Sequence, residues 1–298
     1  MDLSVPQAVF SVRRAAVFLL EGTHLNLGEY LSRVRQQAPV IHAISNYVTA
    51  NDVANVLLAC GASPIMADDP EESAYITALS AGLVLNLGTL SRRRVPAMVA
   101  SGETAARLGR PILLDPVGAG ASPMRTDTAR MLLQRLPVTA LRCNASELRA
   151  ILSGAHTHRG VDADGQDRQG ESGLSHQIAF VKKAARQLGC LVAVTGETDL
   201  VSDGESCFVI HNGRPEMSRV TGTGCQLSAL CAAFLAADPD RSVSALAAAV
   251  CAMGLAGEIA WGHMAPYDGN ATYRNRIIDA VCHLDGETLS KGARYELR

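Results

Sequence analysis

Polar residues that could carry chemistry gather just beyond the ends of six short apolar runs in this chain of 298 residues. These polar sets are Ser45-Asn46, Asp68-Asp69, Gly88-Thr89, residues 115–120, residues 144–147 and Thr195-Gly196. Ligands of open parallel α/β sheets bind outside the carboxyl ends of the strands, where the following loops converge. Six polar sets at equivalent positions therefore predict a composite small-molecule site.

Two carboxylates in these sets, Asp115 and Glu147, are candidates for holding a metal ion. Mg²⁺ prefers oxygen ligands and usually combines one or two protein carboxylates with substrate phosphates and water. Each residue also has a structural alternative. Asn144, three residues before Glu147, fits a capping box at a helix start, and an aspartate before Pro116 stabilises a turn. The sequence leaves both interpretations open.

A glycine-rich segment, Gly222-Thr223-Gly224-Cys225, directly precedes a predicted apolar helix over residues 226–237. Backbone N–H groups and the helix dipole at such a junction favour a bound anion. Cys225 would lie in the first helical turn, where the pKa of a thiol tends to fall. The dinucleotide fingerprint GxGxxG is incomplete, because Leu227 stands in place of its third glycine. Any tight turn would accept these glycines, so the segment is weak evidence by itself.

The apolar runs before the polar sets indicate a layered α/β fold. They cover residues 40–44, 63–66, 83–87, 111–115, 140–143 and 191–194. Because both faces of each run are apolar, we expect strands that are covered by helices on each side. A hairpin is predicted around Asp203-Gly204, and residues 220–278 are predicted to be mostly helical.

Two further segments differ from this alternation. Residues 243–261 form the longest apolar segment, but Glu258 within it disfavours membrane insertion, so we expect a buried helix and no membrane partner. Residues 153–176 contain few apolar side chains and predict an exposed loop or insertion. His156 and His158 in this insertion are expected to be solvated rather than bound to metal.

The length of the chain would allow two domains. The candidate site nevertheless draws residues from Asn46 through Cys225, which favours one continuous domain over residues 28–298. Residues 1–27 are predicted to be a poorly ordered N-terminal extension.

Charge and composition exclude several classes of function. The formal net charge is −2, which argues against a nucleic-acid binder, since binding phosphate backbones needs clustered positive charge. Three of the 27 basic residues are lysines, and none completes a GxxxxGK[ST] P-loop. The eight cysteines form no CxxC pair, and no secretory signal is evident in the first 20 residues. We therefore expect reduced thiols in a cytoplasmic protein.

Taken together, these segments resemble the hydroxyethylthiazole kinases, which belong to the ribokinase-like superfamily. The matching stretches keep their order across residues 28–280 and cover residues 40–52, 61–70, 86–90, 115–119, 144–147, 194–196 and 222–225. Two stretches are highly specific in combination, and each is much less so alone: Met66-Ala67-Asp68-Asp69-Pro70 and Asp115-Pro116-Val117-Gly118-Ala119-Gly120. The resemblance implies a three-layer α/β/α fold with a mostly parallel central sheet.

The resemblance also implies an activity, the transfer of the γ-phosphoryl group of ATP to the primary hydroxyl of 4-methyl-5-(2-hydroxyethyl)thiazole in thiamin biosynthesis or salvage. It implies three groups of site residues, with thiazole contacts at Asn46, Met66, Gly88 and Gly222, ATP contacts at Arg142 and Thr195, and Mg²⁺ ligands, direct or through water, at Asp115 and Glu147. The family is typically a homotrimer with its sites at subunit interfaces.

Cys225 stands where many superfamily relatives carry an aspartate base, and the resemblance makes it the catalytic residue together with the amides of Gly222 and Gly224. Two alternatives share the fold, a hydroxymethylpyrimidine kinase and an ATP-dependent NAD(P)H-hydrate dehydratase. Both are expected to have aspartate at this position, so Cys225 argues against them. A non-catalytic binding protein is a third alternative, and the joint presence of Asp115, Glu147 and Cys225 argues against it.

Overall fold

The computed structural model describes residues 25–153 and 170–298, and within them the strands form one nine-stranded sheet. Its strand order is β2-β1-β3-β4-β5-β6-β7-β8-β9. Neighbours are parallel from β2 to β6 and antiparallel from β6 to β9. The strands are β1 Val40–Ile44, β2 Ser63–Ile65, β3 Gly82–Asn86, β4 Ile112–Asp115, β5 Ala140–Asn144, β6 Leu191–Thr195, β7 Asp199–Ser202, β8 Cys207–Ile210 and β9 Tyr295–Leu297.

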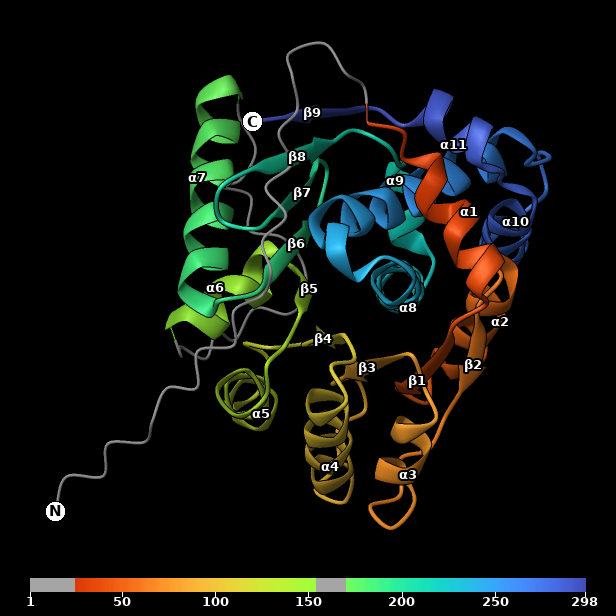
Figure 1. Ribbon diagram of the computed structural model, residues 1–298. Coiled ribbons are helices and arrows are strands. Elements are labelled where there is room, and N and C mark those ends of the chain that lie inside the picture. The colour runs from red at the N-terminus through yellow and green to blue at the C-terminus, as the bar shows by residue number, and fades with distance from the viewer. Residues whose placement is uncertain (1–24, 154–169) are drawn as a thin grey trace, which may run out of the picture.

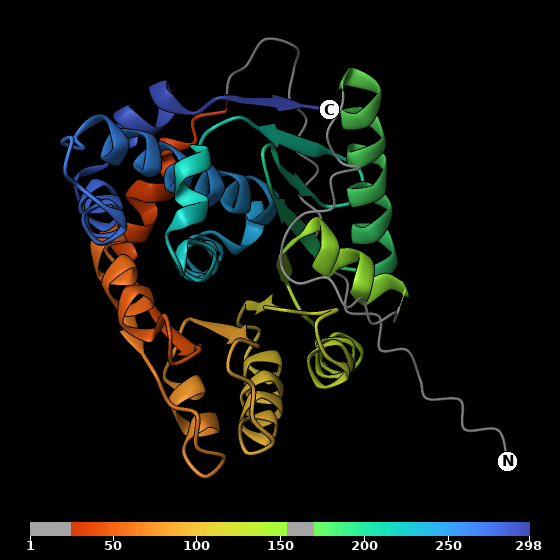
Figure 2. The same cartoon turned by 180° about the vertical axis from the view of Figure 1, so that it is seen from behind.

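Helices cover both faces of this sheet, which gives three layers (Figures 1 and 2). The outer face carries α3 Ser73–Ala78, α4 Arg94–Arg107, α5 Pro123–Arg135, α6 Ala145–Ser153 and α7 Gly170–Leu188. The inner face carries α1 Gly28–Gln37, α2 Ala50–Cys60, α8 Thr223–Ala237, α9 Ser242–Gly262, α10 Asn270–His283 and α11 Gly286–Gly292. Short 3-10 helices span Pro215–Arg219 and Pro239–Arg241. The predicted α/β/α fold with a mostly parallel sheet is confirmed.

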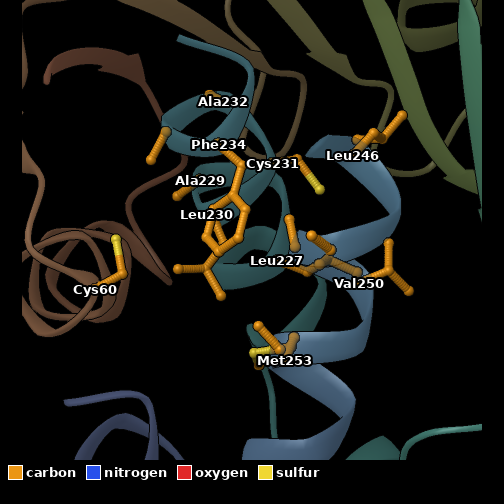
Figure 3. Close-up of a cluster of buried hydrophobic side chains, with 14 of the residues drawn as sticks. Cys60, Leu227, Ala229, Leu230, Cys231, Ala232, Phe234, Leu246, Val250 and Met253 are labelled. Atoms are coloured by element: carbon orange, nitrogen blue, oxygen red, sulfur yellow. The ribbon is translucent and has the colours of Figure 1, made fainter. Parts of the chain in front are cut away.

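Helices α8 and α9 form the centre of the inner layer. Both are apolar on all sides, which is typical of helices that are buried all round, and α8 contacts β1, β3 and β4 while α9 contacts β7 and β8. Figure 3 shows Leu227 of α8 beside Val250 of α9, with Cys60 of α2 on the opposite side of α8. Helix α9 is long and apolar enough to cross a membrane, but 89% of its apolar window is buried inside the protein. It is therefore a core helix, as the sequence predicted.

Of the other local predictions, one is confirmed, one is partly wrong and the rest concern residues that the structure does not describe. The hairpin is confirmed, since β7 and β8 pair on either side of Asp203-Gly204. The predicted loop over residues 153–176 is wrong at its end, because α7 already begins at Gly170 and packs Leu174 and Ile178 against the core. The rest of that insertion, including its two histidines, lies outside the described residues. So does the N-terminal extension except for residues 25–27, of which Leu27 is fully buried.

Candidate active site

The predicted polar sets meet at the carboxyl ends of the parallel strands, where the N-terminus of α8 points at them. The register aligns the last residues of adjacent strands, so that Asn86 of β3 lies opposite Asp115 of β4, and Asn144 of β5 lies opposite Thr195 of β6. Helix α8 packs along β1, β3 and β4, and its first turn brings Cys225 to the carboxyl ends of these strands. The polar sets named from the sequence therefore converge at one edge of the sheet.

Cys225 lies in the first turn of α8, and its sulfur accepts two amide hydrogen bonds. The side-chain amides of Asn46 and Asn86 donate to Sγ at 3.3 and 3.2 Å, and Asn46 also donates to Oδ1 of Asn86 at 3.0 Å. Burial raises the pKa of the Cys225 thiol, and the nearby charge of Asp115 raises it further. The tendency of a helix N-terminus to lower the pKa of a thiol is thus outweighed here by desolvation.

Three glycines allow the close approaches around Cys225. Gly88 donates its N–H to Asn86 at 2.9 Å, and a Cβ on Gly88 would lie 2.8 Å from both Cβ and Nδ2 of Asn46. Gly222 has a φ of +95° as the N-cap of α8, a left-handed conformation that favours glycine. A Cβ on Gly224 would lie 2.6 Å from Nη1 of Arg142, so the helix start rests directly against this guanidinium.

Asp115 is fully buried at the end of β4 and uses only one of its carboxylate oxygens. Its Oδ2 accepts from Ser228 Oγ at 2.7 Å and from Asn86 Nδ2 at 3.0 Å, and it lies 3.7 Å from Nη1 of Arg142. Its Oδ1 has no hydrogen-bond partner among the described residues. Burial raises the pKa of Asp115 to about 6, although the positive charge of Arg142 opposes this shift. A buried carboxylate oxygen without a partner is costly unless a ligand satisfies it.

Arg142 and Thr195, the predicted nucleotide contacts, lie together on the opposite side of Asp115 from Asn86. The guanidinium Nη2 donates to Thr195 Oγ1 at 2.7 Å across the β5–β6 pair. The next turn is closed by Asp199, whose Oδ1 accepts from the N–H of Gly196 at 2.9 Å. Burial raises the pKa of Asp199 to about 7.

Glu147 forms the capping box that the sequence allowed. Its Oε2 accepts from the N–H of Asn144 at 2.9 Å, and Asn144 Oδ1 accepts from the N–H of Glu147 at 2.8 Å. Its Oε1 accepts from the N–H of Gly118 at 2.8 Å, in the loop that follows Asp115. Both carboxylate oxygens are thus engaged by backbone groups. Within the described ranges, no three His, Cys, Asp or Glu side chains group as a metal site.

Met66 stands apart from this buried cluster. It lies one residue beyond β2, the edge strand of the sheet, and its side chain is 38% exposed. The backbone of the next residue, Ala67, is tied to the ring of buried His42. The structure therefore brings together all the predicted site residues except Met66, which faces outward from the neighbouring loop.

Sequence reasoning missed two residues of the site, Asn86 and Ser228. Asn86 bridges the Cys225 sulfur and the Asp115 carboxylate through one amide nitrogen. It belongs to a motif stretch, but an asparagine at the end of a strand gives no sign of its partner until the register is known. Ser228 lies three residues after Cys225 on α8, a spacing that places both on one helix face and could have indicated a shared direction.

The comparisons with known proteins agree with this geometry. A model of the hydroxyethylthiazole kinase family matches residues 31–287. A protein from Clostridium acetobutylicum named hydroxyethylthiazole kinase is 46% identical over 270 residues, which is 91% of this chain and 99% of that protein.

Solved structures give the same result. The structure of a hydroxyethylthiazole kinase protein from Pyrococcus horikoshii matches with a TM-score of 0.81 and 36% identity, over 91% of this chain and 98% of that one. A pyridoxal kinase from Staphylococcus aureus, in complex with ADP, shares the fold with a TM-score of 0.51 at 14% identity, over 71% of this chain and 84% of that one. The chain belongs to the hydroxyethylthiazole kinase family, within the ribokinase-like fold.

Proposed function

We propose that this protein transfers the γ-phosphoryl group of ATP to the primary hydroxyl of 4-methyl-5-(2-hydroxyethyl)thiazole, in thiamin biosynthesis or salvage. Family membership supports this reaction. The observation that carries it is the meeting of three features at the start of α8. These are helix amides with no side-chain cap among the described residues, the Arg142 guanidinium against Gly224, and the Cys225 sulfur. Phosphoryl transfer depends mainly on positioning and on stabilising charge, and this junction offers both.

The two sides of Cys225 would serve the two substrates. On the side of β1 and β3 we assign Asn46, Gly88 and Met66, with Gly222, to the thiazole alcohol. On the side of β5 and β6 we assign Arg142 and Thr195 to ATP, since a guanidinium in a fixed fork suits phosphate oxygens. The hydrogen bond from Arg142 Nη2 to Thr195 Oγ1, at 2.7 Å, supports this assignment, because it holds the guanidinium in one orientation.

Mg²⁺ is the metal that the donor set fits. Asp115 Oδ1 is a buried carboxylate oxygen without a partner among the described residues, and a small hard cation takes such an oxygen. Glu147 has both oxygens on backbone N–H groups, so it would hold the ion through water. When bound, the ion neutralises charge on the phosphates of ATP. Asp115 and Glu147 are thus the residues that we assign to it.

Cys225 would act by orienting the acceptor hydroxyl rather than by removing its proton first. Its raised pKa keeps the thiol neutral at pH 7, and the amides of Asn46 and Asn86 hold the sulfur in one position. A loose transition state needs little early deprotonation. The hydroxyl oxygen forms the new bond to the γ-phosphorus, the bond from that phosphorus to the bridging oxygen breaks, and ADP leaves. The hydroxyl proton is lost late, to an oxygen of the transferred phosphoryl group. The N–H groups of residues 222–224 face the charge of the transferring group, because the first turn of a helix leaves them without intrahelical acceptors.

We further propose a cytoplasmic homotrimer in which a second copy covers the edge of the sheet at β2. Large apolar side chains are exposed on the segments that flank this edge, at Tyr47 (71% exposed), Tyr75 (68%) and Leu79 (60%). Met66 lies on the same edge, so a neighbouring copy would complete the thiazole side of the site. Light scattering on the purified protein measures the assembly directly, and a monomer would contradict this part of the proposal.

The reaction is tested with purified protein, ATP and Mg²⁺, with ADP release measured for each member of a panel of substrates. The panel contains the thiazole alcohol, hydroxymethylpyrimidine and hydrated NADH. We expect ADP release that depends on the thiazole alcohol. ADP release with hydroxymethylpyrimidine or hydrated NADH, but not with the thiazole alcohol, would favour one of the other activities of this fold. The absence of ADP release that depends on the thiazole alcohol would refute the proposal.

The role of Cys225 is tested with two substitutions at one position. Cys225→Ala should keep the fold and lose most of kcat, whereas Cys225→Asp should preserve or raise the rate, because a carboxylate can both orient and deprotonate the hydroxyl. Full kcat in Cys225→Ala would remove the residue from the mechanism.

A further inference from the structure

Arg94 is a buried cation at a position where a helix does not favour one. It is the first residue of α4, with 3% of its side chain exposed. The positive end of the helix dipole lies at the N-terminus, so a cation there destabilises the helix. A residue that breaks a local rule of this kind calls for a compensating contact elsewhere.

The guanidinium of Arg94 contacts three separate loops. It donates to the carbonyl oxygen of Ser45 in the loop after β1, and to those of Gly88 and Thr89 in the loop after β3, at 3.4 and 3.5 Å. Its Nε lies 3.0 Å from Oδ2 of Asp68, in the loop after β2. One side chain therefore joins the ends of three adjacent strands.

The same guanidinium also stacks on an aromatic ring. Its Cζ lies 5.1 Å from the ring centroid of Tyr47, within the range of a cation–π contact. The Tyr47 hydroxyl in turn lies 3.3 Å from Asp68, so that Arg94, Tyr47 and Asp68 form one closed set of contacts.

The backbone in one of these loops is strained. Thr89 has a φ of +48°, which is rare for a β-branched residue. Such conformations persist only where surrounding contacts determine them, and they concentrate at functional sites. Here Arg94 contacts the Thr89 carbonyl, and the N–H of Tyr47 donates to Thr89 Oγ1 at 3.2 Å. These contacts hold the turn that begins at Gly88.

We propose that Arg94 is the positioning residue of the acceptor pocket and fixes the three loops that carry Asn46, Met66 and Gly88. This inference rests on the proposed function, which assigns those three residues to the alcohol. Asn46 directly follows Ser45, and Met66 stands two residues before Asp68, so each is held through a contact of Arg94. Arg94 sets the orientation of the acceptor without touching it, and it leaves the ATP side, at β5 and β6, unaffected.

The test compares Arg94 with its neighbour Arg93. Arg93 is 78% exposed and pairs with Asp69 in the same loop, so Arg93→Gln is a matched control that removes an arginine–aspartate pair without changing the buried contacts. Arg94→Lys keeps the charge but loses the planar fork that reaches three carbonyl groups. Asp68→Asn removes only the carboxylate that pairs with Nε.

In Arg94→Lys we expect kcat/KM for the alcohol to fall by at least about tenfold, because small misplacements of a reacting group are costly. KM for ATP should stay within about twofold of the wild-type value, since the contacts that bind the nucleotide are unchanged. Asp68→Asn should change the same parameters in the same direction, and Arg93→Gln should match the wild type.

A merely structural role would give a different pattern. Equal losses for alcohol and ATP, or equal effects of the Arg93 and Arg94 variants, would overturn the proposal. If wild-type protein releases no ADP with the thiazole alcohol, the proposed function fails on its own. The variants are then compared with whichever panel alcohol the wild type phosphorylates, and a wild type that accepts none overturns both proposals.

Discussion

Gly88 is the position at which one added methyl group should damage the site most selectively. In Gly88→Ala the new Cβ would lie 2.8 Å from Cβ and Nδ2 of Asn46 and 2.9 Å from Cγ, which is closer than van der Waals contact allows. Asn46 cannot simply rotate away, because its amide donates to Asn86 at 3.0 Å and to Cys225 at 3.3 Å. The strain must therefore be relieved by moving the amide or the loop.

The size of the effect follows from these contacts. Overpacking of a buried site costs about 1–3 kcal/mol, and each lost hydrogen bond costs about 0.5–1.5 kcal/mol net. We therefore expect a loss of about 2–4 kcal/mol in the free energy of unfolding, which corresponds to a fall in Tm of about 4–16 °C at roughly 2–4 °C per kcal/mol. Because the Cys225 sulfur loses one of its two amide donors, kcat/KM should fall by about 10²-fold.

The assay combines thermal unfolding with initial rates of ADP release, and Gly262→Ala is the control. A Cβ on Gly262, the last residue of α9, meets no atom within 4 Å, so this variant should keep wild-type rates and a Tm at or slightly above that of the wild type. A Gly88→Ala variant with wild-type rates and Tm would show that the close approach to Asn46 has no part in the site.

Three further predictions concern the nucleotide side and its charges. Folding raises the pKa of Asp199 to about 7, so ionisation of this carboxyl destabilises the folded state increasingly from about pH 4 to pH 7. Asp199→Asn should therefore raise Tm by a few degrees at pH 8 but not at pH 4. Ser228→Ala removes a 2.7 Å hydrogen bond that lowers the pKa of Asp115, so the acid limb of the pH–rate profile should move to higher pH; an unmoved limb would exclude this contact. Gly224→Ala places a Cβ 2.6 Å from Arg142 Nη1 and should raise KM for ATP about tenfold, with KM for the alcohol less affected, and the reverse order would contradict the assignment of the two sides.

The positions of the strands and of most site residues were predictable because they depend on local patterns. Apolar runs followed by polar loops fix where each strand ends, and the carboxyl ends of parallel strands necessarily share one edge. Gly222 and Cys225 were found for the same reason, since a glycine-rich turn before an apolar helix is a local signal. Residues whose role depends on a contact across the fold gave no such signal. The contact of Asn86 with Asp115 depends on the register of β3 and β4. The contacts of Arg94 depend on three loops that come together only in the folded chain.

The pKa of Cys225 shows a different limit of the sequence. Position in the first turn of a helix lowers the pKa of a thiol, and this position could be inferred from the pattern of residues. Burial raises the pKa, and burial depends on α2, β1 and β3, which cover the sulfur from distant parts of the chain. The sign of the shift is therefore a tertiary property, as is the exposure of Met66 just beyond the edge strand.

The packing of α8 and α9 also governs how the chain can acquire its structure during synthesis. The inner face of β1, β3 and β4, strands that are complete by residue 115, is contacted by α8, which begins only at Thr223, and α8 packs in turn against α9. Contacts between segments so far apart in sequence slow folding and leave apolar surface uncovered in the meantime. A nascent chain that has not yet released α9 from the ribosome thus presents a half-covered sheet. We expect the release of α9 from the ribosome to mark the onset of protease resistance in nascent chains, and chaperone demand to be greatest just before it.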